Sequence, residues 1–311
     1  MIICVSANPA IDRRIRLKKL NIGEVNRVES SISFAGGKAA HVAMVAKILG
    51  EEVIWIGFLG GSNGEKVQKQ LSEFGINVIA IPTISETRNN DEIIDENGII
   101  TEILERGSEI QPNELDEIFY VCEQTFAEFP SNFQAVFSGS LPPNVPNDFY
   151  FNLTNKARKF GGKVFLDTSG NALLKGLKAN PDLVKPNRSE AEKICGFTIF
   201  DKVSAVKAAE FFQNQGAKNV ALSLGETGLI YLSNEGNNPI YAKPPKVKVK
   251  STVGCGDSTI AAFAIASARN LDEKETLKLA IACGAANCLA DLPGQISFEM
   301  VQELIKEIEI C

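Results

Sequence analysis

Thr252-Val253-Gly254-Cys255-Gly256-Asp257-Ser258-Thr259 is the stretch around which the chain is organised, together with the apolar run 260–268 that follows it. The run is rich in alanine and contains no helix breaker, so it predicts a buried helix. The two glycines allow the backbone to turn tightly and to present bare N–H groups. Together with the free donors and the positive dipole end of the helix, these groups predict a pocket for an anion such as phosphate.

Asp257 stands at the entry of the predicted helix, beside this anion pocket. A carboxylate there has a chemical use if it accepts the proton of a hydroxyl group that attacks the phosphate. It also has a structural use, because aspartate is among the preferred N-cap residues. Both interpretations stay open on these residues alone. The stretch lacks the third glycine of G-x-G-x-x-G, and the chain contains no G-x-x-x-x-G-K-[ST] motif.

The composition narrows the class of protein. A length of 311 residues fits one large α/β domain or two small ones. The net charge of -6 argues against binding to nucleic acid or to an anionic membrane surface, and an anionic substrate then needs local cations. The apolar run 2–5 has no basic leader, so we expect no signal peptide, and no stretch is long enough for a membrane-spanning helix. Seven cysteines without a C-x-x-C motif predict reduced thiols, a cytoplasmic protein and no structural zinc.

Strand and helix patterns alternate along most of the chain. The expected strands lie at 2–5, 53–58, 78–81, 135–137, 164–167, 183–184 and 219–223, and the expected helices at 38–49, 65–74, 115–126, 149–160, 190–195, 203–214, 259–268, 273–289 and 298–308. The central strands are continuous apolar runs, which predicts a mainly parallel sheet covered by helices on both faces. In such sheets ligands bind beyond the carboxyl ends of the strands.

Charged strand patterns at about 12–34 and 87–106 interrupt this order. Within the second of them, Asn97-Gly98 is a strong hairpin signal, because these residues readily adopt the positive φ angles of the turn. We therefore expect these segments to form a separate small sheet. Two further strands, at 229–232 and 240–242, are expected at an edge of the main sheet.

Several loops together resemble the pfkB family of carbohydrate kinases, which are ribokinase-like. The matching motifs are Thr252-Val253-Gly254-Cys255-Gly256-Asp257-Ser258, Ala35-Gly36-Gly37-Lys38, Ser138-Gly139-Ser140-Leu141-Pro142, Lys185-Pro186-Asn187-x-x-Glu190 and Ser223-Leu224-Gly225-x-x-Gly228. They occur in the family's order and cover essentially the whole chain. The resemblance implies a single three-layer αβα domain over 1–311, with the strands at 12–34 and 87–106 forming a small β-sheet lid. It also implies ATP with Mg²⁺, and a homodimer formed through the lid.

Three further segments are similar to the phosphosugar branch of this family, the kinases for fructose 1-phosphate and tagatose 6-phosphate. They are Asn8-Pro9-Ala10-Ile11-Asp12, Val25-Asn26-Arg27-Val28, and Thr87-Arg88-Asn89 with Thr101-Glu102-Ile103. This similarity implies a sugar bisphosphate as product, with fructose 1-phosphate favoured as substrate over tagatose 6-phosphate and fructose 6-phosphate. The branch usually reads Gly-Gly-Lys-Gly-x-Asn, whereas this chain has Ala39 in place of the last glycine and His41 in place of the asparagine.

The resemblance implies a role for each matched residue. Asp257 is the base, and the N–H groups of Gly254, Cys255 and Gly256 hold the charge that develops on the phosphoryl group. Asp12, Gly37, His41 and Ser138 contact the sugar, while Lys38 and Arg88 hold its phosphate, with Arg27 reaching in from the lid of the same or a partner chain. Asn187 and Glu190 organise Mg²⁺ through water. The nucleotide site is lined by Lys185, Asn187, Ser223, Gly225 and Gly228, with Gly284 and Asn287 beside the adenine.

Structural explanations compete with several of these roles. Asp12 could form an Asx-turn, and Asn187 with Glu190 could simply cap a helix. Lys38, Arg88 and Arg27 could be solvated surface charges.

Two other classes of protein also stay open. A thiol enzyme would use Cys255 at a helix N-terminus, with the chain's one histidine as its partner. A sugar-phosphate sensor would keep the fold without catalysis.

Overall fold

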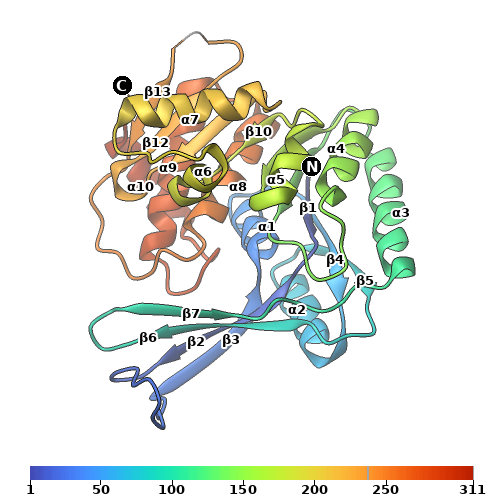
Figure 1. Cartoon of the computed structure of the whole chain (residues 1–311), viewed down its shortest axis with the longest axis vertical. Coiled ribbons are helices and arrows are strands. Elements are labelled where there is room, and N and C mark those ends of the chain that lie inside the picture. The colour runs from blue at the N-terminus through green and yellow to red at the C-terminus, as the bar shows by residue number, and fades with distance from the viewer. Residues whose placement is uncertain (237, 311) are drawn as a thin grey trace.

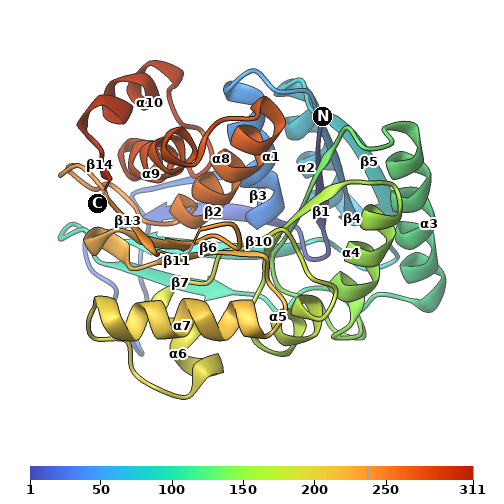
Figure 2. The ribbon, with the colours of Figure 1, turned by 90° about the horizontal axis from the view of Figure 1, so that it is seen from above.

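The computed structural model describes residues 1–236 and 238–310. Within these ranges a large sheet of ten strands lies between two layers of helices (Figures 1 and 2). Its strand order is β14-β13-β12-β11-β10-β9-β8-β1-β4-β5. The strands from β11 to β5 run parallel, and β12, β13 and β14 are antiparallel. The sheet is therefore mainly parallel, as the continuous apolar strands predict.

The strands of this sheet are short and buried where they are central. Their bounds are Ile2–Ser6 (β1), Val53–Leu59 (β4), Asn77–Pro82 (β5), Gln134–Ser138 (β8), Lys163–Asp167 (β9), Leu183–Val184 (β10), Asn219–Ser223 (β11), Leu229–Leu232 (β12), Ile240–Lys243 (β13) and Glu309–Ile310 (β14). Every residue of β1, β4 and β8 is buried, because helices cover both faces of the sheet there.

The helices divide between the two faces, as the view from above shows (Figure 2). One layer contains α1 (Lys38–Ile48), α2 (Gly61–Glu73), α8 (Cys255–Arg269), α9 (Glu273–Leu289) and α10 (Phe298–Leu304). The other contains α3 (Pro112–Glu128), α4 (Phe149–Lys159), α5 (Gly170–Leu177), α6 (Arg188–Cys195) and α7 (Lys202–Asn214). Each layer packs a separate hydrophobic cluster against the sheet, so the fold is a three-layer αβα sandwich.

Four strands form a second, smaller sheet in the order β3-β2-β6-β7. Their bounds are Ala10–Arg16 (β2), Ser30–Gly36 (β3), Arg88–Ile94 (β6) and Ile100–Leu104 (β7). This sheet projects from the three-layer body below β1 and α1 (Figure 1). The expected hairpin joins β6 to β7, and Gly98 in its turn has a φ of 78°. The two charged segments thus pair with each other, as predicted.

The structure departs from the predicted elements at a few places. The helix expected from residue 259 begins at Cys255, because the preceding turn is completed by Gly254. The helix α5 was not predicted, since its sequence is short and begins with glycine. The last helix was predicted to reach residue 308, but it ends at Leu304 and continues as a 3₁₀ turn, Ile305–Glu307.

Length and hydropathy decide whether a helix can cross a bilayer. None of the helices within the described ranges combines enough length with enough apolar character to do so.

Candidate active site

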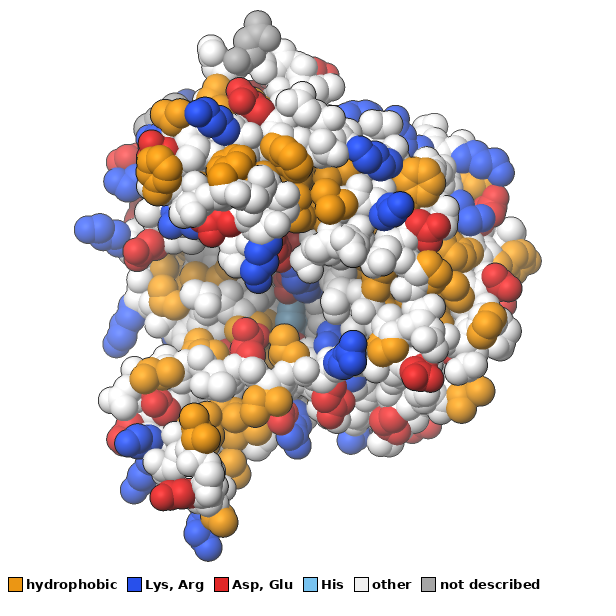
Figure 3. Space-filling model, viewed as in Figure 1, with side chains coloured by type: hydrophobic (Ala, Val, Ile, Leu, Met, Phe, Trp, Pro, Cys, Tyr) orange, Lys and Arg blue, Asp and Glu red, His pale blue; other side chains and the backbone are white. Residues whose placement is uncertain are grey.

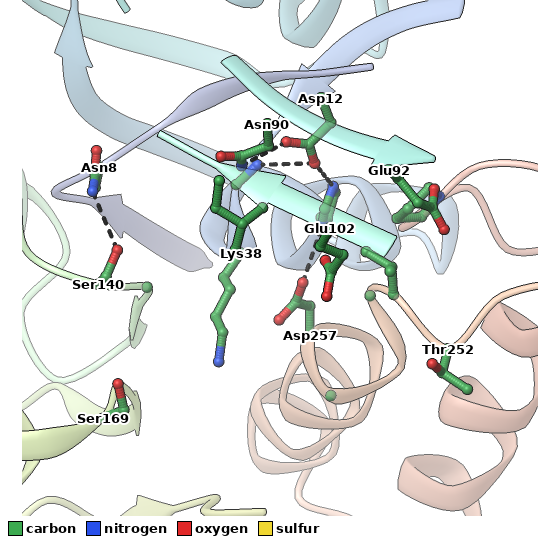
Figure 4. Close-up of a pocket in the computed structure, with 18 of the residues that line it drawn as sticks. Asn8, Asp12, Lys38, Asn90, Glu92, Glu102, Ser140, Ser169, Thr252 and Asp257 are labelled. Atoms are coloured by element: carbon green, nitrogen blue, oxygen red, sulfur yellow. Dashed lines mark hydrogen bonds and ion pairs between the residues drawn. The ribbon is translucent and has the colours of Figure 1, made fainter. Parts of the chain in front are cut away.

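A cavity of about 490 Å³ lies between the carboxyl ends of the main-sheet strands and the small sheet. The space-filling view shows the hollow between the body and the projecting sheet (Figure 3), and the close-up shows the side chains that line it (Figure 4). Its lining brings together Asn8, Asp12, Gly37, Lys38, His41, Arg88, Asn90, Glu92, Glu102, Gly139, Ser140, Lys185, Asn187, Glu190, Ser223, Gly254, Gly256 and Asp257, among others. The strands β1, β8, β9, β10 and β11 are neighbours in the sheet, which is why loops far apart in sequence meet here.

The N-terminus of α8 opens onto this cavity. Gly254 is its N-cap with a φ of 84°, a left-handed conformation that favours glycine. Gly254 and Gly256 line the cavity, and the first-turn N–H groups of a helix have no partners within the helix. The result is a backbone site that suits an anion.

Asp257 lies in the first turn of α8 and faces the cavity, not the helix backbone. Its side chain makes no capping hydrogen bond, because Gly254 occupies the N-cap position. Only 5 % of the residue is exposed. The N-cap interpretation of Asp257 is therefore wrong, and the carboxylate is placed where a reacting hydroxyl can meet it.

His41 joins the carboxylates of Asp257 and Asp12. Its Nδ1 lies 2.8 Å from Oδ2 of Asp257. Its Nε2 lies 3.1 Å from Oδ2 of Asp12, as an ion-pair contact without the geometry of a hydrogen bond. Asp12 is also held by Asn90, whose Nδ2 donates to Oδ1 over 2.9 Å. Since Asp12 lies within β2 and is bound in this way, it forms no Asx-turn.

This arrangement shifts the pKa values of the paired groups. Burial opposes the charged form of His41, but the two carboxylates outweigh it and raise its pKa from 6.5 to about 10. Burial also opposes the charge of Asp12, yet the contacts from His41, Asn90 and the Gly37 N–H lower its pKa. The two carboxylates thus favour the imidazolium form of His41.

Lys38 and Lys185 meet at a second buried carboxylate, that of Asp167 at the end of β9. The Nζ of Lys38 lies 3.3 Å from both carboxylate oxygens, and the Nζ of Lys185 lies 3.5 Å from Oδ1. Burial raises and the two lysines lower the pKa of Asp167, and the net direction is down. Burial likewise opposes the charge of Lys38, but Asp167 above all raises its pKa. The side chain of Lys38 points away from Asp12 and Asn90 (Figure 4).

The two arginines expected at the sugar's phosphate lie in different places. Arg88, at the start of β6, lines the cavity and donates to the backbone oxygens of Glu105 and Asn8 over 2.6 and 3.1 Å. Its buried Nε has no partner among the described residues. Arg27 is exposed in the loop between β2 and β3 and does not line the cavity.

Asn187 and Glu190 line the cavity and also cap α6. The Oδ1 of Asn187 accepts from the Glu190 N–H, and Oε2 of Glu190 accepts from the Asn187 N–H, each over 2.9 Å. The expected capping is therefore present, and it leaves Oε1 of Glu190 without a hydrogen-bond partner among the described residues. The described residues contain no group of three or more His, Cys, Asp and Glu side chains that could enclose a metal. Such a site fits Mg²⁺ that keeps its waters and arrives with a nucleotide.

Several expected site residues lie outside the cavity lining. They are Ser138, Cys255, Gly225, Gly228, Gly284 and Asn287. Asn287 is buried and supports the turn before α8: its Nδ2 donates to the Val253 oxygen over 2.7 Å, and its Oδ1 accepts from the Gly294 N–H over 2.9 Å. Ser138 is buried beneath the loop, and the cavity wall there is formed by Gly139 and Ser140.

The cysteine at the first position of α8 turns its thiol away from the cavity. Its Sγ lies 3.2 Å from Sγ of Cys288 on α9. The contact with Cys288, together with burial, raises the pKa of the Cys255 thiol. A thiol with a raised pKa is a poor nucleophile, so this geometry does not support a thiol enzyme.

Some cavity residues were not predicted individually. Asn8 donates to Ser140 Oγ over 3.2 Å, and both line the cavity. Glu92 pairs with Arg14 over 2.6 Å and accepts from Ser251 Oγ over 2.7 Å, which ties the small sheet to the loop before α8. The charged residues within the small-sheet strands were a signal for these contacts, because buried charges require partners.

The cavity combines four features: a buried carboxylate with room for a hydroxyl, a backbone anion site, a pair of lysines, and the guanidinium of Arg88 in its lining. Transfer of a phosphoryl group to an alcohol can use each of these parts, as base, as charge stabiliser or as phosphate ligand.

Comparisons with known proteins agree with a site for phosphoryl transfer. The family model described as "pfkB family carbohydrate kinase" matches residues 2–295. The chain is 33% identical over 316 residues to the tagatose-6-phosphate kinase of Staphylococcus epidermidis, covering 100% of this chain and 99% of that protein. It is 32% identical over 310 residues to the 1-phosphofructokinase of Vibrio cholerae, covering 99% and 96%. The solved structure of phosphofructokinase-2 from Escherichia coli with fructose-6-phosphate superposes with a TM-score of 0.89 at 28% identity, covering 98% of each chain, and a tetrameric inhibited form of that enzyme superposes equally well.

Proposed function

The chain belongs to the pfkB family of carbohydrate kinases and is a sugar-phosphate kinase, and we propose that it transfers the γ-phosphoryl group of ATP to fructose 1-phosphate. The product is fructose 1,6-bisphosphate. We also propose that residues 1–311 form one kinase domain with the small sheet as its lid, and that it acts in the cytoplasm, where ATP and sugar phosphates are available.

One observation carries the proposal: the buried carboxylate of Asp257 faces the cavity beside the backbone anion site of α8. In the reaction, the acceptor hydroxyl gives its proton to Asp257 while its oxygen bonds to the γ-phosphorus and the bond to ADP breaks. The transition state is loose, so a weak base suffices and most of the catalysis is positioning and charge stabilisation. The N–H groups of Gly254, Cys255 and Gly256 stabilise the charge on the moving phosphoryl group.

We propose a role for Lys38 that differs from the one implied by the resemblance. Because Lys38 lies with Lys185 at Asp167, we place it on the phosphoryl group in transit and not on the phosphate that the sugar brings. Two cations that share one buried carboxylate retain excess positive charge, which an incoming γ-phosphate can neutralise. Asn187 and Glu190 would hold, through water, the Mg²⁺ that accompanies ATP, and Ser223 would line the nucleotide side.

The sugar occupies the opposite side of the cavity. Arg88 binds its phosphate, helped by the polar pair Asn8 and Ser140, and Asp12 binds its hydroxyls. The guanidinium of Arg88 is partly held by backbone oxygens, so it is already oriented before the substrate arrives.

Tagatose 6-phosphate is the second candidate substrate, because a relative of that name is as similar to this chain as the 1-phosphofructokinases. A coupled ADP-release assay over fructose 1-phosphate, tagatose 6-phosphate, fructose 6-phosphate and the free sugars tests the choice. We expect the highest kcat/KM with fructose 1-phosphate and little turnover with free sugars. Turnover that is independent of every sugar phosphate, or absent with all of them, would overturn the proposal.

We also propose that the enzyme is a homodimer that pairs through the small sheet. Half-exposed or fully exposed apolar side chains gather there, and the lower lobe of Figure 3 shows them. They are Ile22, Val25, Val28, Ile32, Ile99, Ile103 and Leu104. Pairing of these faces would also bring Arg27 toward a partner's cavity. Size-exclusion chromatography with light scattering should show a dimer, and Ile103→Lys should weaken it. Phe200→Lys, at an exposed position on the three-layer body, is the control and should leave the dimer intact. An unchanged mass in Ile103→Lys would count against the lid interface.

A further inference from the structure

His41 occupies a position that is unusual for a structural histidine. It lies in the first turns of α1, only 3 % exposed, with a catalytic carboxylate on one ring nitrogen and a sugar-side carboxylate near the other. Its Nδ1 is satisfied by Asp257. Its Nε2 is buried, lacks a hydrogen-bond partner among the described residues, and belongs to a residue that lines the cavity. A buried ring nitrogen without a partner costs free energy unless a ligand pairs with it.

We propose that His41 is a positioning and specificity-determining residue: its Nδ1–H fixes one oxygen of Asp257, and its Nε2–H donates to a sugar hydroxyl that Asp12 also binds. This inference rests on the proposed function of the same site. The acceptor hydroxyl then meets the remaining oxygen of Asp257, and a second hydroxyl bridges His41 and Asp12.

The charges around His41 support a doubly protonated ring. Its contacts are Asp257 on α8 and Asp12 on β2. The other charged side chains of the cavity lining are Lys38, Arg88, Asp91, Glu92, Glu102, Lys185 and Glu190. Asp91 is paired with Arg13, and Lys185 with Asp167. Glu92 is neutralised by Arg14, and Lys38 is engaged by Asp167. Burial raises the pKa of Glu102, and the neighbouring carboxylates add to this shift, which lessens its charge. Two carboxylates in direct contact therefore hold the imidazolium, in agreement with its pKa of about 10.

Asp12 is prepared to share a hydroxyl with His41. Its Oδ1 accepts from Asn90 over 2.9 Å, and its Oδ2 faces both the Gly37 N–H, at 3.4 Å, and His41 Nε2. A substrate hydroxyl placed beside both Oδ2 and Nε2 can donate to the former and accept from the latter. One substrate hydroxyl would then give Nε2 the hydrogen-bond partner that its direct contact with Asp12 does not provide.

The histidine differs from the asparagine that is usual at this position in the phosphosugar branch. The asparagine side chain is shorter and uncharged. It therefore cannot donate charged hydrogen bonds to Asp257 and to a sugar hydroxyl at the same time, as an imidazolium can. The imidazolium also offsets part of the negative charge that an entering sugar phosphate meets in a chain of net charge -6. We therefore expect His41 to influence sugar binding more than ATP binding.

The chain contains one histidine, which makes a direct test practical. In full-length, tag-free protein labelled with ¹⁵N-histidine, long-range ¹H–¹⁵N spectra report only His41. We expect both ring nitrogens to remain protonated from pH 6 to pH 9 and the proton to be lost near pH 10. Asp257→Asn and Asp12→Asn should each lower that midpoint, whereas Glu190→Gln, which removes a cavity carboxylate that does not touch His41, should leave it unchanged. A neutral ring at pH 8 would overturn the proposal, whatever the enzyme's substrate is.

Kinetics then test the role in specificity. His41→Asn and His41→Gln should raise the KM for fructose 1-phosphate about tenfold or more and leave the KM for ATP within about twofold. The ratio of kcat/KM for fructose 6-phosphate to that for tagatose 6-phosphate, which differ in one hydroxyl configuration, should also change by about tenfold. Equal loss on both substrates with unchanged KM values would show that the residue is merely structural. If the unmodified enzyme phosphorylates none of these sugars, the proposed function fails, while the NMR result still decides the state of His41.

Discussion

The Nζ of Lys38 lies 3.3 Å from the carboxylate of Asp167, which is 129 positions away in the chain. The lysine begins α1, just after β3 of the small sheet, and the aspartate ends β9 in the main sheet. With Lys185 on the same carboxylate, the contact gathers positive charge between the nucleotide side and the sugar side of the cavity.

Lys38→Met should lower kcat by roughly 10²- to 10³-fold, because one cation that stabilises the moving phosphoryl group is lost. The KM for fructose 1-phosphate should change little, since we place Arg88 on the sugar's phosphate. Steady-state kinetics with each substrate varied in turn measure the two effects. A large rise in that KM with normal kcat would return Lys38 to the sugar's phosphate.

Asp257→Asn should lower kcat by roughly 10²- to 10⁴-fold, because the base that accepts the hydroxyl proton is lost. The affinity for ATP should remain near normal, as the backbone anion site does not depend on the carboxylate. Turnover and nucleotide binding by calorimetry measure the two quantities separately. Near-normal turnover in this variant would rule out Asp257 as the base.

Arg88→Gln should raise the KM for fructose 1-phosphate about 10- to 100-fold and leave that for ATP unchanged, because a charge-assisted contact with the sugar's phosphate is lost. Arg16→Gln is the matched control, since Arg16 is exposed at the far end of the neighbouring strand and does not line the cavity. Equal effects in both variants would indicate a general loss of positive field and not a specific contact.

Cys255→Ala should retain kcat within about threefold, because the catalytic contribution of this residue is its backbone N–H. Its thiol points to Cys288 and has a raised pKa. The ADP-release assay measures the effect, and a loss as large as that in Asp257→Asn would revive the thiol mechanism.

Much of the fold follows from local sequence patterns. The buried strands and alanine-rich helices were predictable because each has a clear period and clear breakers, and the loops beyond the strand ends located the cavity. The start of α8 was missed by four residues, since Gly254 in a left-handed conformation can stand either before or inside a turn. That shift changes Asp257 from a potential cap into a first-turn residue facing the cavity.

The side-chain pairings could not be predicted in the same way. Lys38 with Asp167 and His41 with Asp257 join residues that are 129 and 216 positions apart, and only the packing of α1 against α8 and the main sheet brings them together. Asn287 shows the same limit: its residue type suggests contact with a ligand, yet it is buried under the turn before α8 and bonded to its backbone. Sequence spacing alone does not tell whether such a residue faces the cavity or the protein interior.

The stability of the protein should fall as the pH rises from about 6.5 toward 10. The folded chain keeps the proton of His41 up to a pKa of about 10, whereas the unfolded chain loses it near the ordinary value of 6.5. The stabilisation is therefore complete below pH 6.5 and is lost as the pH rises through the folded pKa, by at most on the order of a few kcal/mol. Urea unfolding at a series of pH values should show this loss for the native sequence and a flatter profile for His41→Asn. Parallel profiles in the two proteins would mean that His41 is not charged in the folded state, and the bridge between Asp12 and Asp257 would then need a neutral ring.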